Sequence, residues 1–244
     1  MSKQIFLLSL RQLVGKRRTF ALVGLSLLPL LVAVVVRTSD SSADPVDPVD
    51  NALLNYGLIV TTLVPLVTLV LSTTSLGMEI EDGTIVYLLS KPLPRAQVIM
   101  AKLVASWLPA AWLVALSAVL SGSIALEGSG ESSLLLAFVV SSVLGALAYS
   151  SVFLLLSLLT SRALVFGLIY VFIWEGIVTG LFSGTRTLSI REYTLGVADL
   201  LTGTSEFDAH LNGVTALVLM AVVTTAFVAL AIRRLNRFET RSLF

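Results

Sequence analysis

The clearest candidate for chemistry in this sequence is Glu175, the only acidic residue inside one of its long apolar runs. A charged carboxylate at the centre of a bilayer costs roughly 3 kcal/mol on insertion scales. Glu175 should therefore face protein or water, or be protonated. It is either a substrate-path, gating or proton-carrying residue, or a structural acid bound to a neighbouring helix or to a second subunit. Trp174 beside it is a candidate for the same path, or an anchor or lipid-facing residue.

A glycine series follows the acid, with Gly176, Gly180 and Gly184 at intervals of four. Small residues at this spacing let two helices approach closely in a membrane. The series predicts a helix-packing face, either between two subunits or within one chain. Glycine is also common in membrane helices, so the pattern is not specific.

Motifs for enzymatic chemistry are missing from the sequence. It contains no G-x-S-x-G, no H-E-x-x-H and no G-x-x-x-x-G-K-[ST]. There is no cysteine, and His210 is the only histidine, so a multi-histidine or thiolate metal site is excluded. No basic, aromatic-interleaved surface suggests a nucleic-acid partner. We therefore predict a protein with no catalytic residue, no metal and no nucleotide-binding site of its own.

The elements that must position these residues are six apolar runs. Hydrophobic residues make up 56% of the chain and charged residues 13%, against about 25% charged residues in soluble domains. Each run is close to or above the ~20 residues that span a bilayer, and its backbone must pair internally, which requires helices. The fold class is therefore an all-α polytopic bundle forming one membrane domain over 1–244, with spans near 20–36, 52–76, 103–126, 134–159, 163–182 and 214–232.

Two further helices and one linker are expected outside the spans. Residues 2–16 have an apolar stripe and a basic face, which predicts an N-terminal helix lying on membrane lipid, with a frayed terminus as the alternative. Residues 189–192 match the S-x-x-E capping box, and Gly203 is a suitable stop, so a short outer-loop helix is expected at 190–201, on the membrane or capping the bundle. The Asp-Pro repeat of 44–50 predicts an extended linker.

The distribution of Lys and Arg sets the orientation. With the six spans placed as above, 13 of the 16 basic residues fall on one side, and only Arg37, Arg186 and Arg191 on the other. Cytoplasmic loops carry the excess of Lys and Arg. Both termini are therefore expected in the cytoplasm.

The inner loop between the second and third spans has the most informative pattern. Asp82-Gly83 signals a turn, Thr84 can begin a short helix ending near Leu89, and Pro92 stops it. Ile85, Leu88 and Leu89 would be exposed apolar residues rimmed by charge. Such a surface favours docking of a soluble partner, with insertion into the inner leaflet as the alternative.

This loop resembles that of the ABC-2-type transporter permeases. The shared pattern is E-x-E-x-G-T, then L-L-S-x-P, an arginine and a later lysine, carried here by Glu79, Glu81, Gly83, Thr84, Leu88, Leu89, Ser90, Pro92, Arg95 and Lys102. Residues 170–176 also look like the fifth span of a subgroup of these permeases. By this resemblance the candidate ATPase-coupling residues are Glu79, Glu81, Asp82, Gly83, Thr84, Ile85, Leu88, Leu89, Ser90, Pro92 and Arg95.

The resemblance implies an assembly and a location. Two permease chains would pair as a homodimer in a prokaryotic plasma membrane, and two separate ATPase subunits carrying Mg-ATP would dock on the loop helix, acting as a coupling helix. The chain would be the pathway subunit of an exporter. The family handles drug, lipid, polysaccharide, ion and peptide cargo, and nothing in the sequence selects among them.

Two other functions compete with this hypothesis. One is an ATP-independent, proton-coupled secondary transporter that uses Glu175. The other is a membrane scaffold that recruits an ATPase without transporting anything, because its coupling residues would look the same.

Overall fold

The computed structural model describes residues 17–39, 47–81, 94–127, 132–203 and 210–238. Within these ranges all regular elements are helical, and six helices are long and apolar enough to cross a membrane. The predicted all-α, six-span bundle is confirmed. The expected N-terminal helix at 2–16 lies outside the described residues, as does most of the inner-loop pattern.

The first span consists of two helices, α2 (Arg17–Ser26) and α3 (Leu28–Ser39), with a break at Leu27. Pro29 accounts for the break, because it has no N–H to offer the preceding turn and its ring crowds the carbonyl four residues earlier. The Leu27 N–H is shared between the carbonyls of Val23 and Gly24, each at 3.2 Å. The chain is thus bent within the first span.

The second span runs through α4 (Pro48–Leu58), the π-helix η1 (Ile59–Leu63) and α5 (Val64–Glu81). The predicted extended linker of 44–50 is wrong in its last residues, because α4 already begins at Pro48. Asp47 caps this helix by accepting a hydrogen bond from the Val49 N–H at 2.9 Å. Pro48 takes the first helical position, which needs no N–H donor. At its other end α5 continues to Glu81, beyond the predicted 76.

The third and fourth spans are α7 (Arg95–Ala125) and α8 (Ser132–Leu159), and α8 lies at the centre of the bundle. Helix α7 begins well before the predicted 103 and tolerates Pro109 without interruption. Tyr56 stacks on Phe138 with ring centroids 4.4 Å apart, and its hydroxyl is 2.6 Å from Ser141 Oγ. These contacts place the start of the second span tightly against α8.

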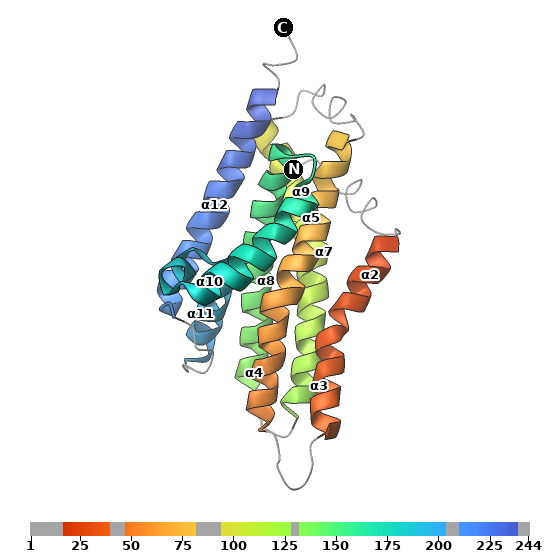
Figure 1. Cartoon of the computed structure of the whole chain (residues 1–244), viewed down its shortest axis with the longest axis vertical. Coiled ribbons are helices and arrows are strands. Elements are labelled where there is room, and N and C mark those ends of the chain that lie inside the picture. Colours follow the sequence, from red (N-terminus) through yellow and green to blue (C-terminus); the bar gives the residue numbers. More distant parts are fainter. Residues whose placement is uncertain (1–16, 40–46, 82–93, 128–131, 204–209, 239–244) are drawn as a thin grey trace.

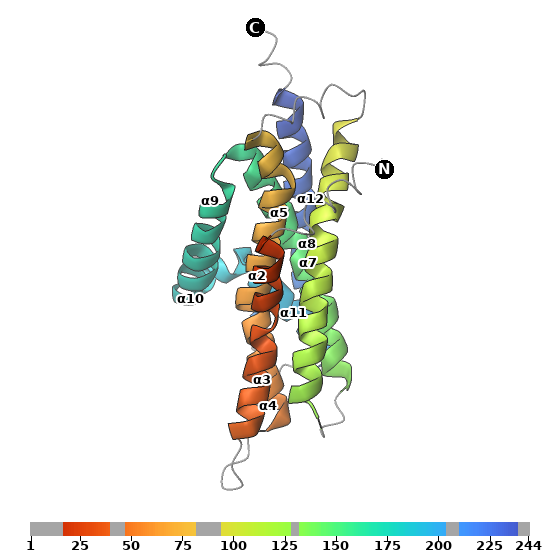
Figure 2. The ribbon, with the colours of Figure 1, turned by 90° about the vertical axis from the view of Figure 1, so that its right-hand side faces the viewer.

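The fifth span is α9 (Ala163–Ile169), the π-helix η2 (Tyr170–Val178) and α10 (Thr179–Leu181), and a 3₁₀ turn η3 (Ser183–Leu188) leads to α11 (Ile190–Thr202). Figure 1 shows α10 and α11 at about mid-height, well above the lower ends of α3 and α4, and the view in Figure 2 agrees. The expected outer helix exists, with its N-cap at Ser189 and its C-cap at Gly203 (φ 70°). It packs against both α8 and α12 (Gly213–Phe238), with Ile190, Tyr193 and Val197 buried, which favours the predicted position against the bundle over the one on the membrane.

Several of the described arginines lie toward one end of the bundle. The starts of α7 and α9 and the end of α12 lie toward that end (Figure 1), and they carry or adjoin Arg95, Arg162 and Arg233. A second apolar cluster gathers α5, α7, α8 and α12 toward that end, around Leu76, Leu103 and Leu158. We refer to this end as the predicted inner side.

Candidate functional site

Glu175 projects from η2 onto the N-terminus of α11. Its side chain is 4% exposed and accepts hydrogen bonds from Ser189 Oγ at 2.5 Å, the Ile190 N–H at 3.0 Å and the Tyr170 hydroxyl at 3.0 Å. A carboxylate at a helix N-terminus binds free N–H donors and the positive end of the helix dipole. The carboxylate of Glu175 therefore anchors the turn where the chain folds back into the bundle.

Local sequence explains both halves of this contact. Ser189 is the N-cap of α11, so its hydroxyl oxygen accepts from the Glu192 N–H at 3.3 Å while its own hydrogen goes to Glu175. On the other side, the wide π-helical turns of η2 bring Tyr170 and Glu175, five residues apart, onto one face. A regular α-helix would not align these two side chains.

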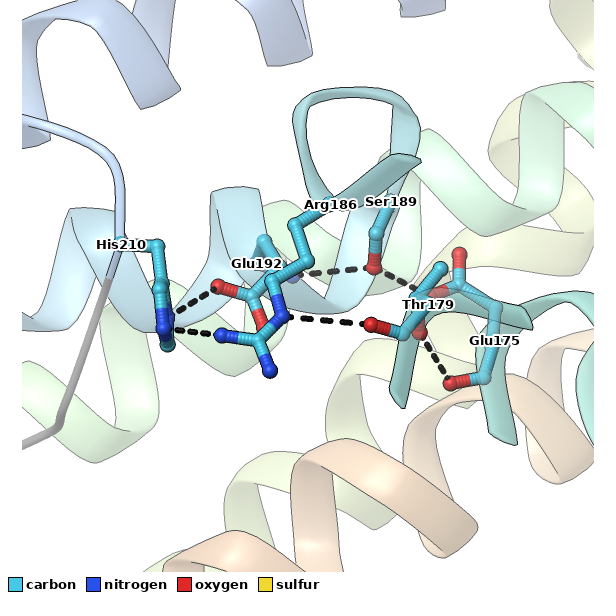
Figure 3. Close-up of polar contacts among 6 residues, drawn as sticks. All are labelled: Glu175, Thr179, Arg186, Ser189, Glu192 and His210. Atoms are coloured by element: carbon cyan, nitrogen blue, oxygen red, sulfur yellow. Dashed lines mark hydrogen bonds and ion pairs between the residues drawn. The ribbon is translucent and has the colours of Figure 1, made fainter. Parts of the chain in front are cut away.

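A chain of polar contacts extends from Glu175 through Thr179 and Arg186 to His210 (Figure 3). The Thr179 hydroxyl donates to the Glu175 carbonyl at 2.6 Å, and Arg186 Nε donates to the Thr179 carbonyl at 3.2 Å. Arg186 also contacts His210, whose Nδ1 is 3.6 Å from Glu192 Oε2. These contacts connect α10, η3, α11 and the segment before α12.

Glycines let α11 fit between its neighbours. A Cβ added to Gly145 of α8 would lie 2.6 Å from Thr194 Oγ1, and one added to Gly213 would lie 2.7 Å from the Gly196 carbonyl oxygen. Neither separation is tolerated without movement, so α8, α11 and α12 approach closely only because side chains are absent there.

Gly213→Ala should lower the thermal unfolding midpoint in detergent, with a cost of about 1–3 kcal/mol for an overpacked contact. Gly24→Ala is the matched control, because no described atom lies within 4 Å of its Cβ position and α2 lies outside both the pocket and the glycine series. Equal midpoints for the two variants would contradict the tight fit of α11.

A pocket of about 750 Å³ opens beside this network. It is lined by α4, α10, η3, α11 and His210 from the segment before α12, and its charged side chains are Asp50, Arg186, Arg191 and Glu192. Leucines complete its wall. A pocket of this volume that combines charged groups with an apolar wall can hold a small amphiphilic molecule.

The glycine series lies on an open face formed by the end of the fifth span and the turn after it. Gly176, Gly180 and Gly184 are exposed, and no described atom lies within 4 Å of the Cβ positions of Gly180 and Gly184. Trp174 is half-buried, while Ile173 and Ile177 are at least half exposed. The glycines therefore do not mediate packing within one chain, and their role at a subunit contact stays a prediction.

The candidate coupling residues are described only at their edges. Glu79 and Glu81 lie in the last turn of α5, and Arg95 begins α7. The others lie outside the described residues: Asp82, Gly83, Thr84, Ile85, Leu88, Leu89, Ser90 and Pro92.

Lys102 has a role that its place in the motif did not suggest. It is 1% exposed, and its Nζ donates to the Ser75 carbonyl at 3.0 Å, which connects α7 to α5 at the predicted inner side. The available signal for Lys102 was a basic residue directly before the predicted third span.

Sequence reasoning also missed Tyr170, Arg186 and Arg191 as contributors to the site around Glu175.

The six-helix bundle, with a fifth span that turns back into α11, defines a polytopic membrane protein. The chain belongs to the ABC-2 family of transporter proteins, whose family model matches residues 4–243. It is a membrane permease of an ABC transporter and not the nucleotide-binding subunit. A comparison with curated proteins finds no match for the chain.

Proposed function

We propose that this permease forms the substrate pathway of an ABC exporter and is driven by a separate ATPase through the segment between α5 and α7. The observation that carries the proposal is the arrangement of these two helices. Both extend past the predicted spans on the arginine-rich side, so the Glu79–Arg95 pattern begins and ends on rigid helices. A partner bound to that segment would act on both helices at once.

The contact between Ser75 and Lys102 supports transmission of such a movement. The Lys102 ammonium is held by the Ser75 carbonyl, and Ser75 Oγ lies 3.5 Å from the Lys102 carbonyl oxygen. A buried, hydrogen-bonded ammonium is costly to leave without a partner, so the two helices should move as a unit. The apolar cluster around Leu76 and Leu103 extends this unit to α8 and α12.

The remaining features of the assembly follow from the same proposal. Two permeases pair through the open face of the fifth span, where the glycines permit close approach. Two ATPase subunits carry Mg-ATP in the cytoplasm of a prokaryotic cell and contact the arginine-rich inner side. Members of this family typically work with an ATPase subunit, which supports the partner.

The experiment is a gentle detergent purification of the tagged chain from its native membrane, with identification of co-purified proteins and an ATP hydrolysis assay. A stoichiometric P-loop ATPase with vanadate-sensitive hydrolysis is the expected result. A clean preparation without an ATPase, together with transport driven by an ion gradient, would favour the proton-coupled alternative. ATP-dependent flux separates a permease from a scaffold.

Charge reversal at the edge of the coupling segment tests docking. Glu81→Arg should greatly reduce the yield of co-purified ATPase, because it places a cation where the acidic cluster is proposed to meet the partner. Leu88→Asp should do the same by making the apolar surface polar. Glu127→Arg is the matched control, since Glu127 lies just after α7 at the opposite end and its side chain is 70% exposed. Wild-type yields in both inner variants would exclude this docking site.

A further inference from the structure

Positive charge is scarce on the predicted outer side, yet most of it gathers in the pocket beside α11. Of the three arginines on that side, Arg37 is paired with Glu127 at 3.3 Å, and both others line the pocket. The chain's single histidine lines it as well. This concentration requires an explanation, because arginine is expensive inside the hydrocarbon layer of a bilayer and α11 lies at about mid-height of the bundle (Figure 1).

The described residues leave the charge of Arg191 partly unsatisfied. Arg191 is half-buried, and its Nε is buried without a hydrogen-bond partner among the residues that the structure describes. It also lies in the first turn of α11, where the positive end of the helix dipole disfavours a cation. An acidic group entering the pocket would relieve both costs through charge-assisted hydrogen bonds.

The other arginine is already occupied. Arg186 donates to the Thr179 carbonyl and contacts His210, and Figure 3 shows its guanidinium directed toward these two residues. It holds the wall of the pocket in place, which leaves Arg191 as the direct ligand for an acid.

The remaining charges indicate that the ligand also carries a cation. Glu192 is 3.6 Å from His210, whereas Asp50, exposed in the first turn of α4, forms no ion pair within the described ranges. Formal charges in the pocket balance, with Arg186 and Arg191 against Asp50 and Glu192. A purely anionic ligand would be attracted by Arg191 and repelled by Asp50, whereas a zwitterion satisfies both.

The apolar lining indicates an amphiphile. Leu53, Leu54 and Leu195 line the pocket, and Leu54 is 62% exposed. Gly180 also lines the pocket, no described atom lies within 4 Å of its Cβ position, and the adjoining Leu181 is 73% exposed. An apolar tail can therefore leave the pocket along α4 and α10 and remain shielded from water.

We propose that this pocket binds a zwitterionic amphiphile, with its acidic group on Arg191, its ammonium group on Asp50 and its apolar part against Leu53 and Leu54. The site goes beyond the proposed transport function, since binding requires neither ATP nor a partner subunit. A membrane lipid and a transported cargo molecule share this chemistry.

Direct binding to the purified full-length chain tests the site, with short-chain phosphatidylethanolamine as the probe and calorimetry as the measurement. Arg191→Gln and Asp50→Asn should each raise its Kd about tenfold, the effect of losing one charge-assisted hydrogen bond. Arg37→Gln, at an outer arginine away from the pocket, should leave the Kd unchanged. Asp50→Asn should also reduce the preference for phosphatidylethanolamine over short-chain phosphatidylglycerol, which lacks the ammonium group.

Two results would overturn the proposal: equal wild-type affinity for the two lipids, or wild-type affinity in both pocket variants. Should Arg191→Gln fail to fold, Asp50→Asn at its exposed position still decides the question. ATP-driven flux of labelled phosphatidylethanolamine in proteoliposomes distinguishes a cargo from a resident lipid, and either supports the site. If the wild-type protein binds the lipid but no ATP-driven flux of any kind is found, the proposed transport function is contradicted and the binding site is not.

Discussion

Glu175→Ala should detach the N-terminus of α11 and abolish transport. The substitution removes the acceptor of three hydrogen bonds and leaves the Ser189 hydroxyl and the Ile190 N–H buried without it. Hydrogen bonds to charged groups contribute about 1.5–3 kcal/mol each, and breaking a buried polar contact costs more than the contact itself contributes. Hydrogen–deuterium exchange over residues 190–202 should therefore rise strongly, with a large loss of ATP-driven flux.

Glu175→Gln separates an anchoring role from a proton-carrying one. The amide oxygen can still accept the Ile190 N–H, so exchange over α11 should rise less than in Glu175→Ala, and flux should fall only in part. Glu127→Gln, at an exposed acid, should change neither quantity. If Glu175→Gln abolished flux while α11 kept wild-type protection, Glu175 would be acting on protons or substrate instead of holding the helix.

Lys102→Met should uncouple the ATPase from the membrane bundle while leaving the two subunits bound. Methionine retains the apolar stem but loses the ammonium that joins α7 to the Ser75 carbonyl of α5. We expect the ATPase to co-purify in wild-type amount, with hydrolysis by the complex reduced about tenfold, equivalent to ~1.4 kcal/mol on the barrier. The expectation rests on the proposal that the segment after α5 receives the ATPase.

Arg162→Met is the control for Lys102→Met, because it removes an exposed cation at the same end of the bundle. It should leave hydrolysis unchanged. A proportional loss of hydrolysis and of bound ATPase in Lys102→Met would indicate a docking defect, and normal hydrolysis would show that the contact between α5 and α7 does not transmit movement.

The number of spans could be predicted because lipid imposes a strict local condition. An apolar run of about 20 residues must be helical, whatever surrounds it. The ends of the helices could not be read in the same way. Helix α5 continues to Glu81, and α7 already begins at Arg95. Both extend beyond their apolar runs because polar residues are compatible with a helix once it leaves the hydrocarbon layer. Asp47 and Pro48 likewise begin a helix where their composition predicted a linker.

Helix α11 separates local from tertiary information most clearly. Its existence and both its ends follow from residues in contact along the chain, with Ser189 capping the start and Gly203 in the left-handed conformation at the end. Its position follows from contacts between distant segments: Thr194 lies against Gly145, and Gly213 lies against Gly196. The amphipathic pattern of α11 is satisfied equally by a membrane surface and by a protein groove, so the pattern could not choose between them.

The sequence by itself determined that Glu175 is a costly acid in an apolar helix and that it needs a partner. Only the tertiary structure identified that partner as the N-terminus of α11, and showed Arg191 and Asp50 sharing one pocket. Burial cost depends on residue type and is visible in the sequence. Whether that cost is offset depends on which donors and charges the folded chain brings within a few ångströms of the buried group. Packing between residues far apart along the chain decides this.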